Sequence, residues 1–149
     1  MPFEQAVFLR IDTAEGKPYL EGPTSGEMVV ATLFGGRDKG WFDLIGFVVL
    51  PCEVQLIIFP RRVAAGSVVS SLEADLYPAL SVVKPISTTI FDPDFYREKI
   101  DMDEELRQRL RWMHLTPVRT RLTTLAESYP FSSANARFRD MLHTVRSAS

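Results

Sequence analysis

The sequence predicts an α+β fold with the element order β-α-β-β-α-β, in which an antiparallel sheet carries helices on one face and C-terminal helices follow. Three observations lead to this prediction: a dense apolar hairpin at residues 41–60, helical periodicity on both sides of it, and glycine- or proline-rich stretches between the elements. The chain has 149 residues, enough for one domain with a hydrophobic core. It contains no internal repeat or linker, so we expect residues 1–149 to form a single domain.

The hairpin should lie at the centre of the sheet. Residues 41–50 are rich in aromatic and β-branched side chains, and residues 54–59 are almost all apolar. Pro51 falls at the break between the two strands, where a residue without a backbone N–H is tolerated. Two polar residues, Glu53 and Gln55, interrupt the second strand, and their i, i+2 spacing places both on one face.

Before the hairpin we expect one strand and one helix. Residues 5–12 alternate loosely and predict the first strand. A helix should follow, capped by Thr24 or Ser25 and running to about Phe34. A group of glycines is expected to end it: Gly35, Gly36 and Gly40.

After the hairpin the pattern predicts a second helix and a last strand. Residues 66–77 carry Val68, Leu72 and Leu76 at i, i+4 and i+8, which is typical of a helix. Residues 85–91 are β-branched and are predicted as the last strand. This order of elements is that of the split, ferredoxin-like βαββαβ motif.

Helices are expected in the C-terminal third. Residues 102–114 should form a helix with Asp101 as its N-cap, and Pro117 should end it. Its buried stripe is predicted to consist of Leu106, Leu110 and Met113. A short terminal helix, capped by Ser132 or Ser133, would use four apolar side chains: Phe138, Met141, Leu142 and Val145.

Composition narrows the class of protein. Apolar residues make up 46% of the chain and charged residues 24%, which is ordinary for a globular protein. No window resembles a membrane span or a secretory signal. The single Cys52 cannot form an internal disulfide, which suits a reducing compartment. We therefore expect a cytoplasmic protein without a membrane partner.

The charge is unevenly distributed. The formal net charge is −2, which argues mildly against nucleic-acid binding. Residues 1–100 hold 9 Lys or Arg and 13 Asp or Glu, whereas residues 106–149 hold 8 Arg and only 2 acidic residues. The basic C-terminal third is either a solvated helical surface or a phosphate-binding surface. The second interpretation is open because arginine, unlike lysine, can bind a phosphate through two N–H groups at once.

Three blocks of the sequence resemble the HUH-type tyrosine transposases, in particular the REP-associated tyrosine transposases. Residues 46–57 read GFVVLPCEVQLI, similar to the family's AYVVMPNHVHLLL. Residues 112–119 read WMHLTPVR, similar to its YIHLNPVK, and the YPFSS of residues 129–133 follows as in the family. A weaker third match is IFDPDFY at residues 90–96.

The resemblance implies a chemistry that this chain has lost. In the family, two histidines on the central strand hold a divalent metal such as Mg²⁺, which polarises the scissile phosphate, and a tyrosine becomes covalently linked to single-stranded DNA. The histidine positions hold Glu53 and Gln55 here, and the tyrosine position holds Trp112. Mg²⁺ accepts carboxylate and amide oxygens, but the imidazole pair is gone and tryptophan has no hydroxyl. We therefore expect a catalytically inactive relative with no cofactor and no catalytic residue.

Two functions remain open. The first is a transposase-like protein that keeps DNA binding, with single-stranded or hairpin DNA as its partner. Its nucleic-acid-binding residues would supply phosphate contacts and base stacking: Arg107, Arg111, Trp112, Arg119 and Arg121. The second is a structural or protein-interaction module on the same fold with no DNA binding, which the net acidic charge favours. The family often dimerises, so the resemblance allows a homodimer.

Overall fold

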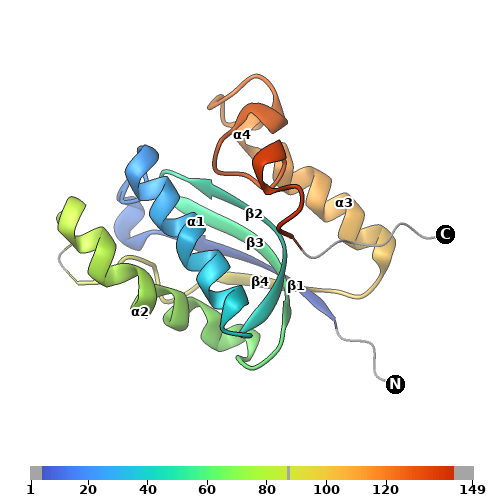
Figure 1. Cartoon of the computed structure of the whole chain (residues 1–149), viewed down its shortest axis with the longest axis horizontal. Coiled ribbons are helices and arrows are strands. Elements are labelled where there is room, and N and C mark those ends of the chain that lie inside the picture. The colour runs from blue at the N-terminus through green and yellow to red at the C-terminus, as the bar shows by residue number, and fades with distance from the viewer. Residues whose placement is uncertain (1–4, 87, 143–149) are drawn as a thin grey trace.

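The computed structural model describes residues 5–86 and 88–142 as a four-stranded antiparallel sheet flanked by helices (Figure 1). The strands lie in the order β2-β3-β1-β4, with every neighbouring pair antiparallel. This is the ferredoxin-like arrangement, and the predicted α+β class is confirmed. The main elements are β1 (Ala6–Asp12), α1 (Pro23–Asp38), β2 (Phe42–Leu50), β3 (Glu53–Pro60), α2 (Ala65–Val83), β4 (Tyr96–Ile100), α3 (Asp103–His114) and α4 (Thr116–Arg119).

The sheet separates two hydrophobic clusters. Helices α1 and α2 lie side by side over one face, and α3 lies against the other (Figure 1). Alternation along β3 decides which side chain faces which cluster: Leu56 packs under α1 and α2, whereas Ile57 packs under α3. Gln55 is on the α3 face because it is two residues from Ile57. Helix α3 covers only part of its face, which leaves a polar floor beside it.

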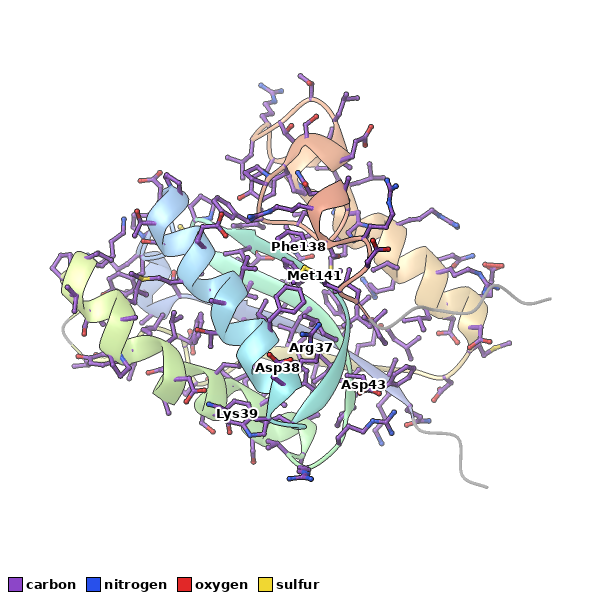
Figure 2. The ribbon with its side chains drawn as sticks, viewed as in Figure 1. Arg37, Asp38, Lys39, Asp43, Phe138 and Met141 are labelled. Carbon is purple, nitrogen blue, oxygen red and sulfur yellow. The ribbon has the colours of Figure 1, made fainter. Side chains whose placement is uncertain are left out.

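The segment after α4 closes the free edge of β2. Ser132 forms a bridge to Val48, and the backbone N–H of Val49 donates to the carbonyl of Phe131 at 2.8 Å. Further along, Phe138 inserts between Phe34 and Phe47, with ring centroids 5.8 and 5.1 Å away. Figure 2 shows Phe138 and the neighbouring Met141 beside the end of α1. The edge strand is therefore covered rather than exposed.

The last strand is not where the sequence predicted it. Residues 85–91 were expected to be extended in the sheet, but only Phe91 makes a bridge, to Thr13. The backbone N–H groups of Ile90 and Phe91 instead donate to the carboxylate of Glu73 on α2, at 3.3 and 3.1 Å. The fourth strand is the charged YREKI segment of β4. An edge strand can carry many charges because one of its faces is open to solvent.

Helices α1 and α2, on the face of the sheet opposite α3, are both longer than predicted. Helix α1 begins at Pro23, after Gly22 in a left-handed conformation (φ 96°), and continues through Gly35 and Gly36. At Gly36 the helix comes close to Phe42. A Cβ at this position would lie 2.9 Å from the Phe42 ring, so the close approach needs a glycine. Helix α2 continues past Pro78 to Val83, with Leu80 fully buried.

Three local predictions in the C-terminal third are also wrong. Met102, not Asp101, is the N-cap of α3, and no side chain caps it. Pro117 does not end the helical region but lies in the first turn of α4. The predicted terminal helix is replaced, over the described residues, by turns and a 3₁₀ turn at Ala136–Phe138. Val145, expected in that helix, lies outside the described residues.

No helix of residues 5–86 and 88–142 combines the length and the apolar character needed to span a bilayer.

Candidate functional site

One row of side chains crosses the sheet on the α3 face. Tyr96 on β4 pairs with Arg10 on β1, Arg10 pairs with Gln55 on β3, and Gln55 pairs with Val48 on β2. Directly paired residues of neighbouring strands point to the same face and lie about 5 Å apart. The row therefore places two exposed side chains, Tyr96 and Arg10, beside the buried Gln55.

A chain of hydrogen bonds joins this row to α3 and α4. The amide of Gln55 donates to the carboxylate of Glu53. The Gln55 carbonyl Oε1 accepts from Thr116 Oγ1 at 3.4 Å, and Thr116 Oγ1 accepts from Arg119 Nη2 at 2.8 Å. Arg119 Nη1 donates to the backbone carbonyl of Trp112 at 3.0 Å. The structure thus links Glu53, Gln55 and Trp112 through two residues of α4.

Trp112 presents a half-exposed ring that contacts two arginines. Its side chain is 49% exposed. The guanidinium carbon of Arg119 lies 3.9 Å from the ring centroid, and that of Arg109 lies 5.6 Å from it. Arg109 is itself fixed by an ion pair with Glu98 and by packing over Phe8. Cation–π contacts of this kind hold the indole in place, and about half of the residue stays exposed.

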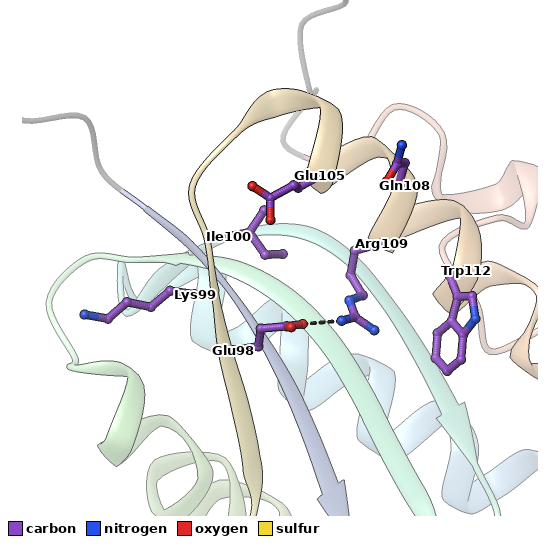
Figure 3. A pocket seen from close by; sticks show the side chains of 7 residues that line it. All are labelled: Glu98, Lys99, Ile100, Glu105, Gln108, Arg109 and Trp112. Carbon is purple, nitrogen blue, oxygen red and sulfur yellow. Dashed lines mark hydrogen bonds and ion pairs between the residues drawn. The ribbon is translucent and has the colours of Figure 1, made fainter.

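A hollow of about 260 Å³ lies between β4 and α3 beside this tryptophan. Figure 3 shows that Arg109 reaches across it toward Glu98 while the Trp112 ring projects along its rim. The remaining lining residues are mostly charged or polar: Lys99, Ile100, Glu105 and Gln108. This hollow is too small for a drug-sized ligand, and part of the Trp112 side chain borders it.

The other flank of α3 carries a different group of side chains. Arg107 lies there, in an ion pair with Glu104 at 4.0 Å, and lines a separate hollow together with His114 and Ser133. His114, the last residue of α3, places its Nε2 2.6 Å from Ser133 Oγ. Burial lowers the pKa of His114 to about 4, which keeps the ring neutral near pH 7. His143 lies outside the described residues.

The five predicted nucleic-acid-binding residues are therefore only partly brought together. Trp112 and Arg119 are in contact, and Arg111 is exposed on the outer side of α3. Arg121 is exposed just after α4, in a left-handed conformation (φ 63°). Arg107 faces away from Trp112, because a separation of five residues puts the two on opposite flanks of the helix.

Glu53 and Gln55, which the sequence resemblance puts at the metal position of the family, do not fit a divalent metal. Glu53 and Gln55 share one face, but the Gln55 amide group donates to the Glu53 carboxylate. The single side-chain oxygen of Gln55 accepts from Thr116 Oγ1. A metal site needs several oxygen or nitrogen ligands that converge on one point. Within the described part of the chain, no cluster of three or more His, Cys, Asp or Glu side chains is suited to hold a metal ion.

Comparison with known proteins gives a fold but no sequence match. No family model and no curated protein matches this sequence. Among solved structures, a REP-associated tyrosine transposase bound to a REP hairpin superposes with a TM-score of 0.74, covering 98% of this chain and 86% of that one at 17% identity. The chain has the fold of a REP-associated tyrosine transposase. A putative transposase from Deinococcus radiodurans R1 superposes with a TM-score of 0.57 at 11% identity, covering 75% of this chain and 91% of that one.

The transposase fold explains which site residues the sequence revealed and which it did not. The resemblance in the three blocks pointed to Glu53, Gln55 and Trp112, and the fold is the one that this resemblance implies. Sequence reasoning missed Arg10 and Tyr96, which reach the site only through the pairing of β1 with β3 and β4. Thr116, at the asparagine position of the second block, was the available signal for the hydrogen-bond chain.

Proposed function

We propose that this protein is a catalytically inactive relative of the single-strand DNA transposases and binds single-stranded or hairpin DNA. The observation that carries the proposal is the Trp112 ring, half-exposed and backed by Arg119, at the position where the family places its nucleophile. A fixed indole next to a guanidinium combines a stacking surface for a base with a fork for a phosphate. The REP-associated transposase that shares this fold is bound to a REP hairpin, which supports a DNA partner.

The arginines have graded roles in this proposal. Arg119 uses two of its five N–H donors within the protein, so three remain to contact a phosphate. The side chains of Arg111 and Arg121 make no hydrogen bond or ion pair within residues 5–86 and 88–142, which leaves them available to the same backbone. Arg107, on the opposite flank, would contact only a ligand that wraps around α3.

Inactivity follows from the replaced side chains. Tryptophan offers no hydroxyl to attack a phosphate. The residues in place of the two histidines satisfy each other, so nothing at this position would hold the family's metal. We expect the protein to bind DNA without cutting it.

The test is direct binding, with Trp112 as its own reporter. The chain has 2 tryptophans, so a Trp41→Phe variant leaves Trp112 as the only one. Its fluorescence should fall when single-stranded or hairpin DNA is added and should change less with plain duplex. In anisotropy assays, Trp112→Ala and Arg119→Ala should weaken binding. Arg62→Ala, which changes an exposed arginine beside Gly40, should not.

The alternative is a protein-interaction module without DNA binding. The net charge of −2 favours it. So does a mainly apolar hollow of about 590 Å³ between α2 and residues 88–95. If the wild-type protein retains neither single-stranded nor hairpin DNA at low salt, the DNA-binding proposal is wrong and this alternative replaces it. The homodimer and the cytoplasmic location stay predictions of the sequence.

A further inference from the structure

We propose that Arg10 and Tyr96 form the second half of the binding face, so that one short single strand is held by two arginine–aromatic pairs on either side of Gln55. Arg119 with Trp112 is the first pair, and Arg10 with Tyr96 is the second. The inference rests on the proposed function and names residues and a ligand path that the three sequence blocks do not reveal. In this arrangement arginine side chains, not a metal ion, supply the positive charge that meets the phosphates.

The second pair also combines an arginine with a half-exposed aromatic ring. The guanidinium carbon of Arg10 lies 5.7 Å from the centroid of the Tyr96 ring, and Tyr96 is 47% exposed. The ring contacts the buried Phe8 edge-on, with centroids 6.2 Å apart and an interplanar angle of 64°. Phe8 therefore fixes the orientation of the tyrosine while one of its sides stays open to solvent.

The two pairs are connected by packed side chains. Phe8 touches Tyr96 on one side and carries the guanidinium of Arg109 at 4.7 Å on the other, and Arg109 in turn lies against Trp112. Aromatic rings and guanidinium groups therefore form one continuous run of contacts from β4 to α4. Because β4, β1 and α3 are each fixed in the fold, the two open rings keep a constant separation, as a track for successive bases requires.

The charged side chains on the α3 face of the sheet decide where a phosphate would lie. Arg10 makes no ion pair or hydrogen bond from its side chain within the described residues. Four acidic residues lie near this face. Glu98 is paired with Arg109, and Glu53 accepts from Gln55, whereas Asp12 on β1 and Glu105, which lines the hollow beside Trp112, make no ion pair or side-chain hydrogen bond within the described residues. A phosphate would sit toward Arg10 and Arg119, away from the row that contains Asp12 and Glu53.

This chemistry selects unpaired nucleic acid. Every base has a π-face that can stack on tyrosine or tryptophan, so binding should depend little on sequence. In a duplex these faces are already stacked and paired, and a plain duplex would meet only the arginines. The ligand class is therefore a single-stranded segment, either free or in the loop or flank of a hairpin.

The test compares substitutions at residues whose side chains point to opposite faces of the sheet. Tyr96→Ala should raise the Kd for single-stranded DNA by about 5-fold to 100-fold, whereas Tyr96→Phe should bind like the wild type, because stacking needs the ring and not the hydroxyl. Arg10→Ala should weaken binding and flatten its salt dependence by about 0.7 for each phosphate that Arg10 neutralises. The control is Arg97→Ala: Arg97 lies on β4 too, but its guanidinium reaches Gly66 on the α2 side. EDTA should leave the wild-type Kd unchanged.

The outcomes separate the two proposals. If Trp112→Ala weakens binding and Tyr96→Ala, shown to be folded by its thermal melt, does not, the second pair is wrong while the proposed function stands. Equal losses for Tyr96→Phe and Tyr96→Ala, or loss of binding in EDTA, would also overturn it. A wild-type protein that binds no single-stranded or hairpin DNA overturns both.

Discussion

The guanidinium of Arg119 stacks on the ring of Trp112, with its central carbon 3.9 Å from the ring centroid. The same arginine donates to the backbone carbonyl of Trp112 and to the hydroxyl of Thr116. It is therefore held in one orientation although it is exposed. A held guanidinium loses little side-chain entropy when a phosphate binds, which favours affinity.

The first prediction concerns salt. If Arg111 and Arg119 each contact a phosphate, replacing both with alanine should weaken binding to all single-stranded sequences alike. It should also lower the slope of log K against log salt by about 1.4, since each contact to a single strand contributes about 0.7. Fluorescence anisotropy at four or more salt concentrations measures the slope. A double variant with an unchanged slope would show that these arginines are surface charge only.

The second prediction is that the protein does not cleave DNA. Labelled single-stranded and hairpin substrates incubated with Mg²⁺ or Mn²⁺ should yield neither cut product nor a covalent protein adduct on a denaturing gel, because the nucleophile position holds Trp112. An adduct would contradict this prediction. Mapping it to Tyr96 or Tyr77 by the Tyr→Phe variants would then identify a relocated nucleophile.

A third prediction tests the metal position itself. Changing Glu53→His and Gln55→His together places two imidazoles at i, i+2 on one face of β3. This double variant should bind Mn²⁺ or Zn²⁺ more tightly than the wild type by calorimetry, since imidazoles are good ligands for such ions. The single Gln55→His variant is the control. Equal metal affinity in the wild type and the double variant would mean that this part of β3 does not correspond to the family's metal site.

The sequence predicted the parts of the fold whose signal is local. The hairpin was predictable because its apolar density is typical of central strands, and the core stripe of α3 was predictable from its spacing. Strand β4 was missed because YREKI carries three charges. The last strand was predicted at the β-branched residues 85–91 instead. A strand at a sheet edge is defined by its pairing with β1, which no local pattern records.

The site divides in the same way. Glu53, Gln55 and Trp112 lie in blocks that can be compared with a family, so their positions were accessible. Arg10 and Tyr96 come from strands that are far apart in sequence and meet only through register. Arg107 was grouped with Trp112 from its charge, but the helical period puts the two on opposite flanks of α3.

The fourth prediction concerns pH. Burial lowers the pKa of His114 to about 4, whereas an unfolded histidine titrates near 6.5. Between these values the unfolded chain binds the proton and the folded protein does not, so the free energy of unfolding should fall as the pH drops from about 6.5 to 4. The full effect is at most about 3 kcal/mol. In urea titrations His114→Gln should remove this component, and the wild-type and variant curves should converge as the pH falls. Parallel curves would contradict it.

The fifth prediction uses two glycines as a matched pair. Gly46 lies on β2 where α3 crosses it, and a Cβ there would be 2.5 Å from Leu110 Cδ1 and 3.1 Å from Met113 Cε and from Ser133 Oγ. Gly46→Ala should therefore force the side chains of Leu110, Met113 and Ser133 to shift between β2 and α3 and destabilise the protein by about 1–3 kcal/mol. Because α3 carries Trp112, the variant should also weaken DNA binding.

Gly35 is the control for that substitution. It lies inside α1, and a Cβ there would meet no atom within 4 Å, so Gly35→Ala should stabilise the protein by about 0.5–1 kcal/mol through helix propensity. Thermal and urea unfolding of the two variants measure the difference. If Gly46→Ala is as stable as Gly35→Ala, the packing between β2 and α3 is looser than described, and the fixed placement of Trp112 over the sheet loses its support.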